Sequence, residues 1–288
     1  MSYKARFPHP FVKWAGGKSQ VLDEISKILP QKYDRYYEPF LGGGALFFHI
    51  RPGNALISDS NFELINAYTT IRDNLNQLIV ELDALQKQIL SRPLFEKYKK
   101  LDPKKLPQTN RAARFIFLNK TCYNGLWRVN RRGEFNVPIG KYRTMPKLSD
   151  KENLHETRRL LQRTHIICDD YGSVLAKAGK RDLIYLDPPY SKDSAQAFVS
   201  YTKESFSEAD QRRLATKFRE LDNRGCLLIL SNSDTDFVRG LYSEYRDRTI
   251  KISAGRWINS VGSDRTGYSE LLITNYVPTI ETLSPWIR

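Results

Sequence analysis

The sequence predicts an α/β fold in which a mainly parallel sheet is interrupted by a basic insertion. Short apolar runs alternate with amphipathic stretches at both ends of the chain, as strands and helices do when they follow one another. The middle part breaks this alternation with helical, Lys/Arg-rich pieces punctuated by prolines. We therefore predict a domain formed by residues 1–75 and 160–288, with a second, mainly helical domain at 76–159 inserted into it.

The helices and strands before and within the insertion are predicted from the spacing of apolar residues and from the positions of prolines. Before the insertion we predict helices at 18–29, from 45 to about 50 and at 61–72, and strands at 35–38 and 55–58. Pro30 ends the first helix, because proline has no backbone N–H to donate to the preceding turn of a helix. Inside the insertion, prolines at 93, 103 and 107 separate the helical pieces. Arg131-Arg132-Gly133 then predicts a hairpin turn.

After the insertion the alternation of strands and helices returns. Strands are predicted at 165–168, 183–186, 226–230, 246–252 and 270–274, and helices at 207–222 and 234–243. The run 183–186 is apolar at every position, which is typical of a parallel strand buried on both faces. It is therefore predicted to be a buried strand of a parallel sheet.

Composition excludes several classes of protein. The chain has 288 residues, 40% of them hydrophobic, and contains no apolar run long enough to predict a membrane span. Its beginning, Met1 to Arg6, lacks the apolar stretch of a signal peptide. Three cysteines far apart in the sequence argue against a disulfide framework, and with only four histidines no metal site has plausible ligand spacing. We expect a cytoplasmic protein without a metal, monomeric in solution.

The net charge of +14 is concentrated in one quarter of the chain. Residues 1–90 have a net charge of +1, residues 91–165 a net charge of +13, and residues 166–288 a net charge of zero. A diffuse excess would serve solubility alone. A concentrated one is more typical of a surface that binds nucleic acid.

Asp187-Pro188-Pro189-Tyr190 directly follows the predicted buried strand at 183–186. In open α/β sheets ligands bind beyond the carboxyl ends of the strands. The two prolines form a stiff turn between an acid and an aromatic ring, an arrangement that suits a flat ring bearing an NH2 group. Asp187 and the Pro188 carbonyl can accept its two hydrogens, and Tyr190 can stack on its face. The alternative is a strand-ending turn with a solvated acid.

A glycine turn opens the helix after the first strand. It comprises the residues Phe40-Leu41-Gly42-Gly43-Gly44-Ala45. Glycines let the backbone approach a ligand closely, and doubly wound folds hold a nucleoside-type cofactor at this junction. The spacing does not match the dinucleotide fingerprint. Asp59 ends the second strand, where an acid can accept hydrogen bonds from both hydroxyls of a ribose.

Two further segments allow both a structural and a functional interpretation. Gly17-Lys18-Ser19 resembles the end of a phosphate-binding loop, but the glycine required five positions earlier is Val12, so we reject an NTPase. Trp14, in the same segment, is either a core residue or a ligand contact. In Cys168-Asp169-Asp170-Tyr171, one of the two acids either binds the amino group of an adenine or caps the following helix.

The stretch from Tyr123 to Arg143 is basic and interleaved with aromatic residues. Arg can bind guanine through two hydrogen bonds in the major groove, and Leu or Pro can contact the methyl group of thymine. Other Lys and Arg side chains can pair with phosphates. Tyr123 could wedge between bases. The alternative is a solvated, charged hairpin whose aromatic residues belong to the core.

Taken in order, these motifs resemble the DNA adenine methyltransferases of the Dam type. The resemblance rests on Lys-Trp-Ala-Gly-Gly-Lys, on Glu-Pro-Phe-x-Gly-Gly-Gly-Ala, on the basic insertion and on Asp-Pro-Pro-Tyr, and it runs from Phe11 to about Tyr276. It implies a Rossmann-like sheet with one reversed strand, at 270–274, near its edge. It also implies S-adenosylmethionine as methyl donor and an insertion that recognises the DNA target, with a β-hairpin.

The resemblance implies a role for each matching position. Asp187, Pro188, Pro189 and Tyr190 would hold the target adenine. The cofactor would be bound by Trp14, Lys18, Phe40, Gly42, Gly44, Ala45, Asp59, Asp170 and Tyr171. DNA would be bound by Lys13, Tyr123, Asn124, Leu126, Arg128, Asn130, Arg131, Pro138, Lys141 and Tyr142, with Tyr123 as the intercalating residue. Trp127 and Lys141 stand where relatives vary.

The stretch from Asn124 to Tyr142 is similar to the recognition hairpin of the GATC-methylating members of this family. The resemblance therefore implies methylation of adenine N6 in double-stranded DNA, within GATC, with the target base flipped out of the duplex. Two alternatives stay open. Similar Pro-Pro-Tyr motifs serve methylation of RNA or of a protein amide, and a DNA-binding protein without catalysis could retain the same scaffold.

Overall fold

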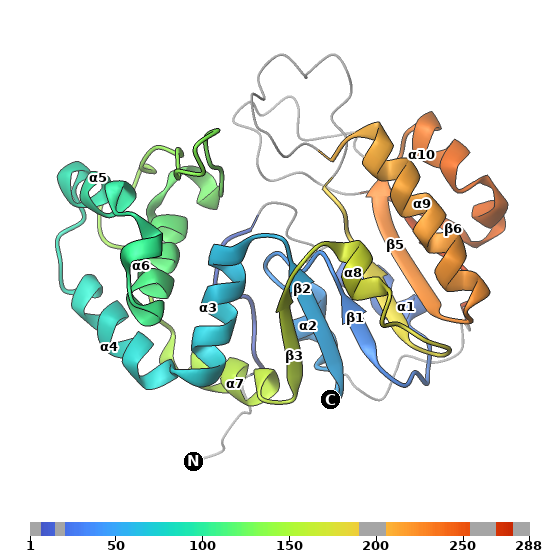
Figure 1. Cartoon of the computed structure of the whole chain (residues 1–288), viewed down its shortest axis with the longest axis horizontal. Coiled ribbons are helices and arrows are strands. Elements are labelled where there is room, and N and C mark those ends of the chain that lie inside the picture. The colour runs from blue at the N-terminus through green and yellow to red at the C-terminus, as the bar shows by residue number, and fades with distance from the viewer. Residues whose placement is uncertain (1–6, 15–20, 190–205, 254–268, 279–288) are drawn as a thin grey trace. The chain divides into compact units, whose positions relative to one another are not determined.

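Figure 1 shows a computed structural model of the chain, which describes residues 7–14, 21–189, 206–253 and 269–278. Seven strands of the described residues form one hydrogen-bonded sheet in the order β3-β2-β1-β4-β5-β7-β6. The strands are β1 (Tyr36–Glu38), β2 (Ala55–Asp59), β3 (Thr164–Cys168), β4 (Leu183–Leu186), β5 (Leu227–Ser233), β6 (Thr249–Ser253) and β7 (Ser269–Thr274). The predicted α/β class is confirmed.

The centre of the sheet is parallel, and one strand near its edge is reversed. In β4, Leu183 is aligned with Tyr36 of β1 and with Leu227 of β5, and both pairings are parallel. All four residues of β4 are buried, as expected of a parallel strand covered on both faces. The strand β7 runs antiparallel to β5 and to β6. The reversed strand predicted at 270–274 is therefore present.

The chain folds into two compact units. The first comprises Met1–Gly17, Gly42–Arg51 and Asp59–Cys168, and the second comprises Lys18–Leu41, Pro52–Ser58 and Asp169–Arg288. The predicted division at 76–159 was drawn from charge and composition, whereas this one follows packing. It groups the helices just before residue 76 with the insertion.

The first unit is built around a buried helix, α6. Its helices and turns are α2 (Ala45–Ile50), α3 (Phe62–Asp73), α4 (Leu75–Gln86), α5 (Arg92–Lys100), η1 (Pro103–Lys105), α6 (Gln108–Thr121), η2 (Tyr123–Gly125) and α7 (Lys151–Leu161). The helix α6 packs against α3, α4 and α5. Its buried Arg114 donates to the carbonyls of Tyr98 (2.7 Å) and Lys99 (3.0 Å), at the carboxyl end of α5 where a cation is favourable. This contact fixes the end of the Lys-rich α5.

The second unit contains the remaining described helices. They are α1 (Leu22–Ile28), α8 (Tyr171–Leu175), α9 (Glu208–Asn223), α10 (Asp236–Leu241) and the 3-10 helix η4 (Ser243–Arg248). The helix α9 begins with a capping box between Ser207 and Asp210 and packs against β5. None of the helices in the described parts of the chain is both long enough and apolar enough to span a membrane.

Most predicted elements are present, with one error at the start of β6. Residues 246–248, predicted as strand, belong to the 3-10 helix η4, and the strand begins at Thr249. Tertiary contacts of Tyr245 explain the difference. Its ring packs on Phe218 of α9, and its hydroxyl donates to Asp222 at 2.8 Å. These contacts favour the helical turn over an earlier start of the strand.

A buried carboxylate anchors the reversed strand to its neighbours. The Asp234 side chain, only 7% exposed, follows β5 and accepts hydrogen bonds from Ser269 of β7 (2.7 Å), Lys251 of β6 (3.0 Å) and Arg239 of α10 (2.6 Å). Burial opposes ionisation of this group, but the three donors together hold the pKa of Asp234 below its ordinary value. The ionised form therefore stabilises the fold, and this contribution is lost as the pH falls through the folded-state pKa.

We predict that Asp234→Asn lowers the free energy of unfolding at pH 7 by about 2 kcal/mol, because hydrogen bonds to a charged group are replaced by weaker ones. The difference from wild type should shrink as the pH falls below the unfolded-state pKa of aspartate, about 3.9, and should vanish below the lower folded-state pKa, where the wild-type carboxyl has also lost its charge. Thermal unfolding between pH 7 and pH 3 measures this. Asp247→Asn, at an exposed aspartate, is the control. A difference for Asp234→Asn that stays constant with pH would contradict the assignment.

Candidate functional site

The part of the glycine turn from Gly42 to Ala45 lies in the first unit and is held by Asp59. Gly42 and Gly44 have φ angles of +50° and +69°, which L side chains rarely adopt. Oδ2 of Asp59 accepts from the Gly42 N–H at 2.9 Å, and Oδ1 accepts from the Asn61 N–H at 2.9 Å. The Tyr68 hydroxyl donates to the Gly42 carbonyl at 3.3 Å. Asp59, predicted as a ribose ligand, thus also holds the turn in place.

Trp14 lies directly against this turn. A Cβ added at Gly42 would stand 2.6 Å from Cδ1 of Trp14, and one added at Gly43 would stand 3.2 Å from its Cβ. The Trp14 side chain is half-buried, and its ring centroid is 6.4 Å from that of Phe115 in α6. The structure therefore brings together Trp14, the glycine turn and Asp59. Lys18, predicted to bind the same ligand, lies outside the described residues.

In the second unit, Asp187 follows the last residue of β4. Its side chain is half-buried, Pro188 is buried and Pro189 is exposed. The neighbouring strand β1 ends at Glu38, a buried carboxylate that accepts from the Tyr36 hydroxyl at 2.7 Å. Burial, and after it the charge of Glu38, raises the pKa of Tyr36. Tyr190 lies outside the described residues.

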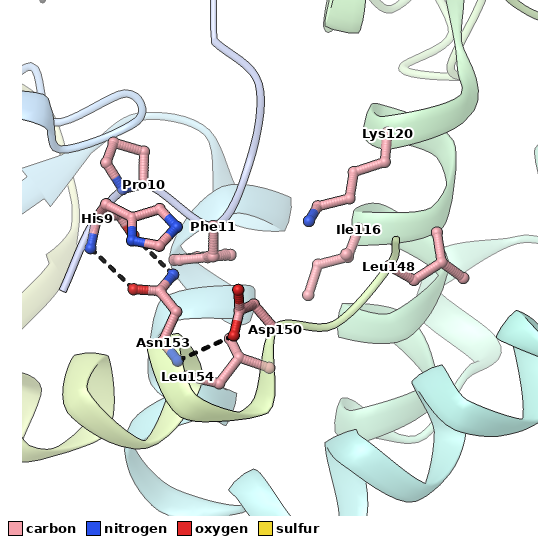
Figure 2. A pocket seen from close by; sticks show the side chains of 9 residues that line it. All are labelled: His9, Pro10, Phe11, Ile116, Lys120, Leu148, Asp150, Asn153 and Leu154. Atoms are coloured by element: carbon pink, nitrogen blue, oxygen red, sulfur yellow. Dashed lines mark hydrogen bonds between the residues drawn. The ribbon is translucent and has the colours of Figure 1, made fainter. Parts of the chain in front are cut away.

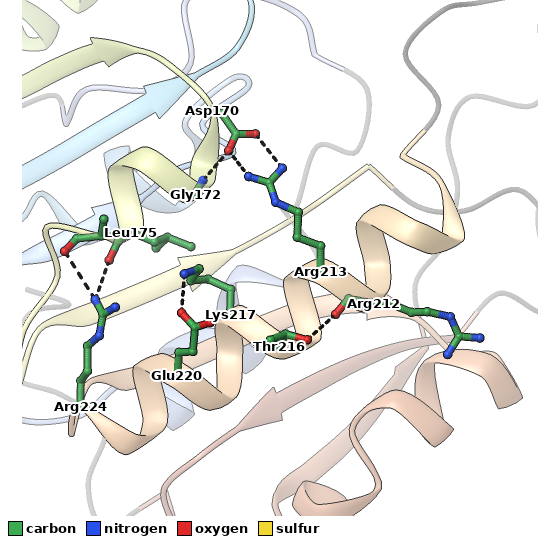
Figure 3. Close-up of polar contacts among 10 residues, drawn as sticks. Asp170, Gly172, Leu175, Arg212, Arg213, Thr216, Lys217, Glu220 and Arg224 are labelled. Atoms are coloured by element: carbon green, nitrogen blue, oxygen red, sulfur yellow. Dashed lines mark hydrogen bonds and ion pairs between the residues drawn. The ribbon is translucent and has the colours of Figure 1, made fainter.

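Asp170 has the structural role that the sequence left open, and a second partner in addition. It caps α8 by accepting from the Gly172 N–H at 2.9 Å, and it pairs with both terminal nitrogens of Arg213 on α9, at 2.5 and 3.3 Å (Figure 3). The Arg213 guanidinium also lies over the Tyr171 ring, 4.7 Å from its centroid. A Cβ at Gly172 would come within 2.7 Å of Arg213.

Sequence reasoning missed Arg213, because no local pattern relates it to a residue 43 positions earlier. Beside it, the Tyr171 ring packs at 5.1 Å from Phe40 and at 6.1 Å from Phe206. The second unit thus gathers Phe40, Asp170 and Tyr171, three of the residues predicted to bind the cofactor.

The basic hairpin at 123–142 belongs to the first unit and is held by side chains more than by strand pairing. Its only backbone pairing among the described residues consists of isolated bridges, including Val129 with Phe135. The Trp127 ring packs between Phe115, at 4.4 Å, and Phe135, at 4.6 Å. These aromatic residues form the base of the hairpin, as the structural alternative proposed, with Phe115 and Phe135 buried and Trp127 partly buried.

The predicted turn of the hairpin is present, and Asn130 closes it. Oδ1 of Asn130 accepts from the N–H groups of Arg132 (2.9 Å) and Glu134 (3.0 Å), and Gly133 has a φ of +79°. This gives Asn130 a structural role besides the DNA contact predicted for it. Arg131 next to it is exposed.

The other residues predicted to bind DNA divide by exposure. Tyr123, Asn124, Arg128, Pro138 and Lys141 are exposed, whereas Leu126 and Tyr142 are partly buried. Lys13 Nζ donates to the Tyr142 hydroxyl at 2.9 Å, so the structure brings together two predicted DNA contacts that are 129 positions apart.

A small cavity lies in the first unit beside the N-terminal segment (Figure 2). Its volume of about 30 Å³ has room for one water molecule and is too small for a substrate. Lys120 of α6 lines it, and burial, with the nearby charge of Lys13, lowers the pKa of Lys120 to about 8. Among the described residues, no group of three or more His, Cys, Asp or Glu side chains is placed to hold a metal ion.

Residues 14–256 match the family model of the D12 class of N6 adenine-specific DNA methyltransferases. The chain belongs to this family. The match covers the glycine turn, the hairpin and the Asp187 turn, and it favours DNA methylation over the two alternatives left open by the sequence.

Individual methyltransferases are similar over almost their whole length. The type II methyltransferase M.MjaIII of Methanocaldococcus jannaschii is 41% identical over 93% of this chain and 99% of its own. The type II methyltransferase M1.LlaDCHI of Lactococcus lactis is 39% identical over 93% and 95%. The DNA adenine methylase of Escherichia coli K12 is 32% identical over 91% and 93%. This chain is thus a DNA adenine methyltransferase.

We predict that Gly42→Ala lowers the free energy of unfolding by about 2 kcal/mol, because the new methyl group meets Trp14 and the φ angle is unfavourable for alanine. Chemical denaturation measures this. Gly53→Ala is the matched control, since a Cβ there meets no atom within 4 Å. Equal stability of the two variants would show that Trp14 does not lie against the turn.

Proposed function

We propose that the enzyme transfers a methyl group from S-adenosylmethionine to N6 of adenine within GATC in double-stranded DNA, after the base has been flipped out of the duplex. The observation that carries this proposal is the position of Asp187 and Pro188. They follow the buried central strand at the edge where α/β sheets bind their ligands.

Asp187 and the Pro188 carbonyl act by accepting the two hydrogens of the adenine amino group. In free adenine the lone pair of this nitrogen is delocalised into the ring. Two fixed acceptors draw the nitrogen toward tetrahedral geometry and so release the lone pair for attack. Positive charge develops on the nitrogen as the N–C bond forms, and the carboxylate stabilises it. The cation then loses a proton to solvent, so a strong general base is not required.

S-adenosylmethionine supplies an electrophilic methyl group on a sulfonium, and the first unit fits such a ligand. Gly42 lacks the side chain that would clash at the turn, and Asp59 stands at the end of β2. The second unit contributes an acid and aromatic faces suited to an adenine ring. We assign cofactor binding to Trp14, Lys18, Phe40, Gly42, Gly44, Ala45, Asp59, Asp170 and Tyr171.

Recognition of the DNA is assigned to the insertion at 76–159, which overlaps residues 91–165, the part of the chain that carries nearly all of the net charge. Arg128 is exposed on the hairpin and suits a guanine, while Arg131 and Lys141 suit phosphates. Tyr123 is 38% exposed beside Asn124, whose φ is +52°. An aromatic ring on such a turn suits wedging into the duplex in place of the flipped base. One chain supplies all of these residues, which supports a monomer.

We predict that a duplex oligonucleotide with a single GATC accepts labelled methyl groups from S-adenosylmethionine, and that a duplex with the adenine pair replaced accepts none. Scintillation counting of the recovered DNA measures this. Labelling of both duplexes, or of neither, would refute the GATC assignment.

We predict that Asp187→Ala reduces the rate of methylation at least about 100-fold and leaves duplex binding nearly unchanged, because the carboxylate acts on the transition state. Single-turnover methylation and fluorescence anisotropy with the same duplex measure the two quantities. Asp34→Ala, at an exposed aspartate of the same unit, is the control for the change in charge. A near wild-type rate for Asp187→Ala would refute the mechanism.

A further inference from the structure

Two asparagines hold the N-terminal segment of the first unit in the same way. Asn153 of α7 accepts from the His9 N–H at 2.9 Å and donates to the His9 carbonyl at 2.9 Å (Figure 2). Asn119 of α6 accepts from the Lys13 N–H at 2.8 Å and donates to the Lys13 carbonyl at 2.7 Å. Each side-chain amide thus satisfies both the N–H and the carbonyl of one backbone residue of the segment, as a neighbouring strand would do.

Asn119 differs from Asn153 by one further bond. Its Nδ2 also donates to the carbonyl of Gly125 at 3.1 Å, in the turn η2 that begins the hairpin. The Asn119 side chain is fully buried, so these bonds do not compete with water. A Cβ at Gly125 would stand 2.3 Å from the Cβ of Lys13, and the φ of Gly125 is +67°. The segment and the turn are therefore in direct contact, with no room for a methyl group between them.

Asn119 holds the backbone of Lys13, and the next residue, Trp14, contacts the glycine turn. Trp14 lies against Gly42, while Lys13 contacts Gly125 and the Tyr142 hydroxyl. Two consecutive residues thus belong to two different binding sites: Lys13 is assigned to DNA and Trp14 to the cofactor. Any displacement of the Lys13 backbone moves both contacts together.

We propose that Asn119 is a positioning residue that holds the cofactor-contacting Trp14 and the DNA-reading turn at Tyr123–Gly125 in one fixed arrangement. The proposal rests on the function assigned above and adds to it that cofactor affinity and sequence discrimination depend on the same buried amide. Neither function requires Asn119 to touch cofactor or DNA.

The matched variants are Asn119→Ala and Asn153→Ala. Each removes a buried amide that holds one backbone residue of the same segment through two hydrogen bonds, so both should lower the melting temperature. Asn119→Ala additionally releases the Gly125 carbonyl. We expect Asn119→Ala alone to weaken S-adenosylhomocysteine binding without DNA by about tenfold, and to reduce the kcat/KM ratio between GATC and a duplex with one changed base by about tenfold.

Isothermal titration with S-adenosylhomocysteine and steady-state methylation of the two duplexes measure these quantities. Equal effects of Asn119→Ala and Asn153→Ala on both quantities would overturn the proposal, since both residues would then serve only stability. If wild type does not discriminate GATC, the proposed target is wrong, and the titration still tests the role of Asn119.

Gly125→Ala tests the contact between the turn and Lys13 without changing Asn119. It tests the proposal even if Asn119→Ala does not fold. The added methyl group pushes against Lys13, so cofactor affinity and discrimination should again fall together. Wild-type cofactor affinity in Gly125→Ala, with altered discrimination alone, would show that the turn is not linked to Trp14 and would overturn the proposal.

Discussion

The parallel pairing of β4 on both of its sides is the constraint on which the proposed catalytic chemistry depends. With β1 and β5 hydrogen-bonded in register, β4 has no freedom to shift along its length, because a slip of one residue would turn every side chain to the other face. The strand ends where two prolines remove the N–H groups that pairing needs. Asp187 therefore leaves the sheet at a position set by its most buried strand, and its carboxylate need not be held by a flexible loop.

Much of the fold could be predicted because its signals are local. The apolar run of β4, the glycines before α2 and the acid at the end of β2 each lie next to the element that they define. The reversed strand β7 came from the resemblance to a family, since its own residues show no sign of direction. The start of β6 was predicted wrongly, because packing of Tyr245 on α9 overrides local preference.

Local sequence patterns could single out candidate residues for the site, but not the contacts that these residues make. Side chains that end strands or open helices stood out, whereas Arg213 and Asn119 did not, because each acts through a partner remote in sequence. An asparagine inside a helix is ordinarily a weak helix former. Its meaning here lies in the backbone groups of Lys13 and Gly125, which only the tertiary structure brings within reach.

In the hairpin, the residues that stabilise its fold are different from the residues that are exposed to solvent. The packed rings of Trp127 and Phe135 support it, and not a long ladder of backbone hydrogen bonds. Arg128 and Arg131 face solvent. Substitutions at the exposed positions should therefore have little effect on the fold. With the DNA-reading role proposed for this hairpin, a lineage of such enzymes could acquire a new target sequence by point changes without first rebuilding its scaffold.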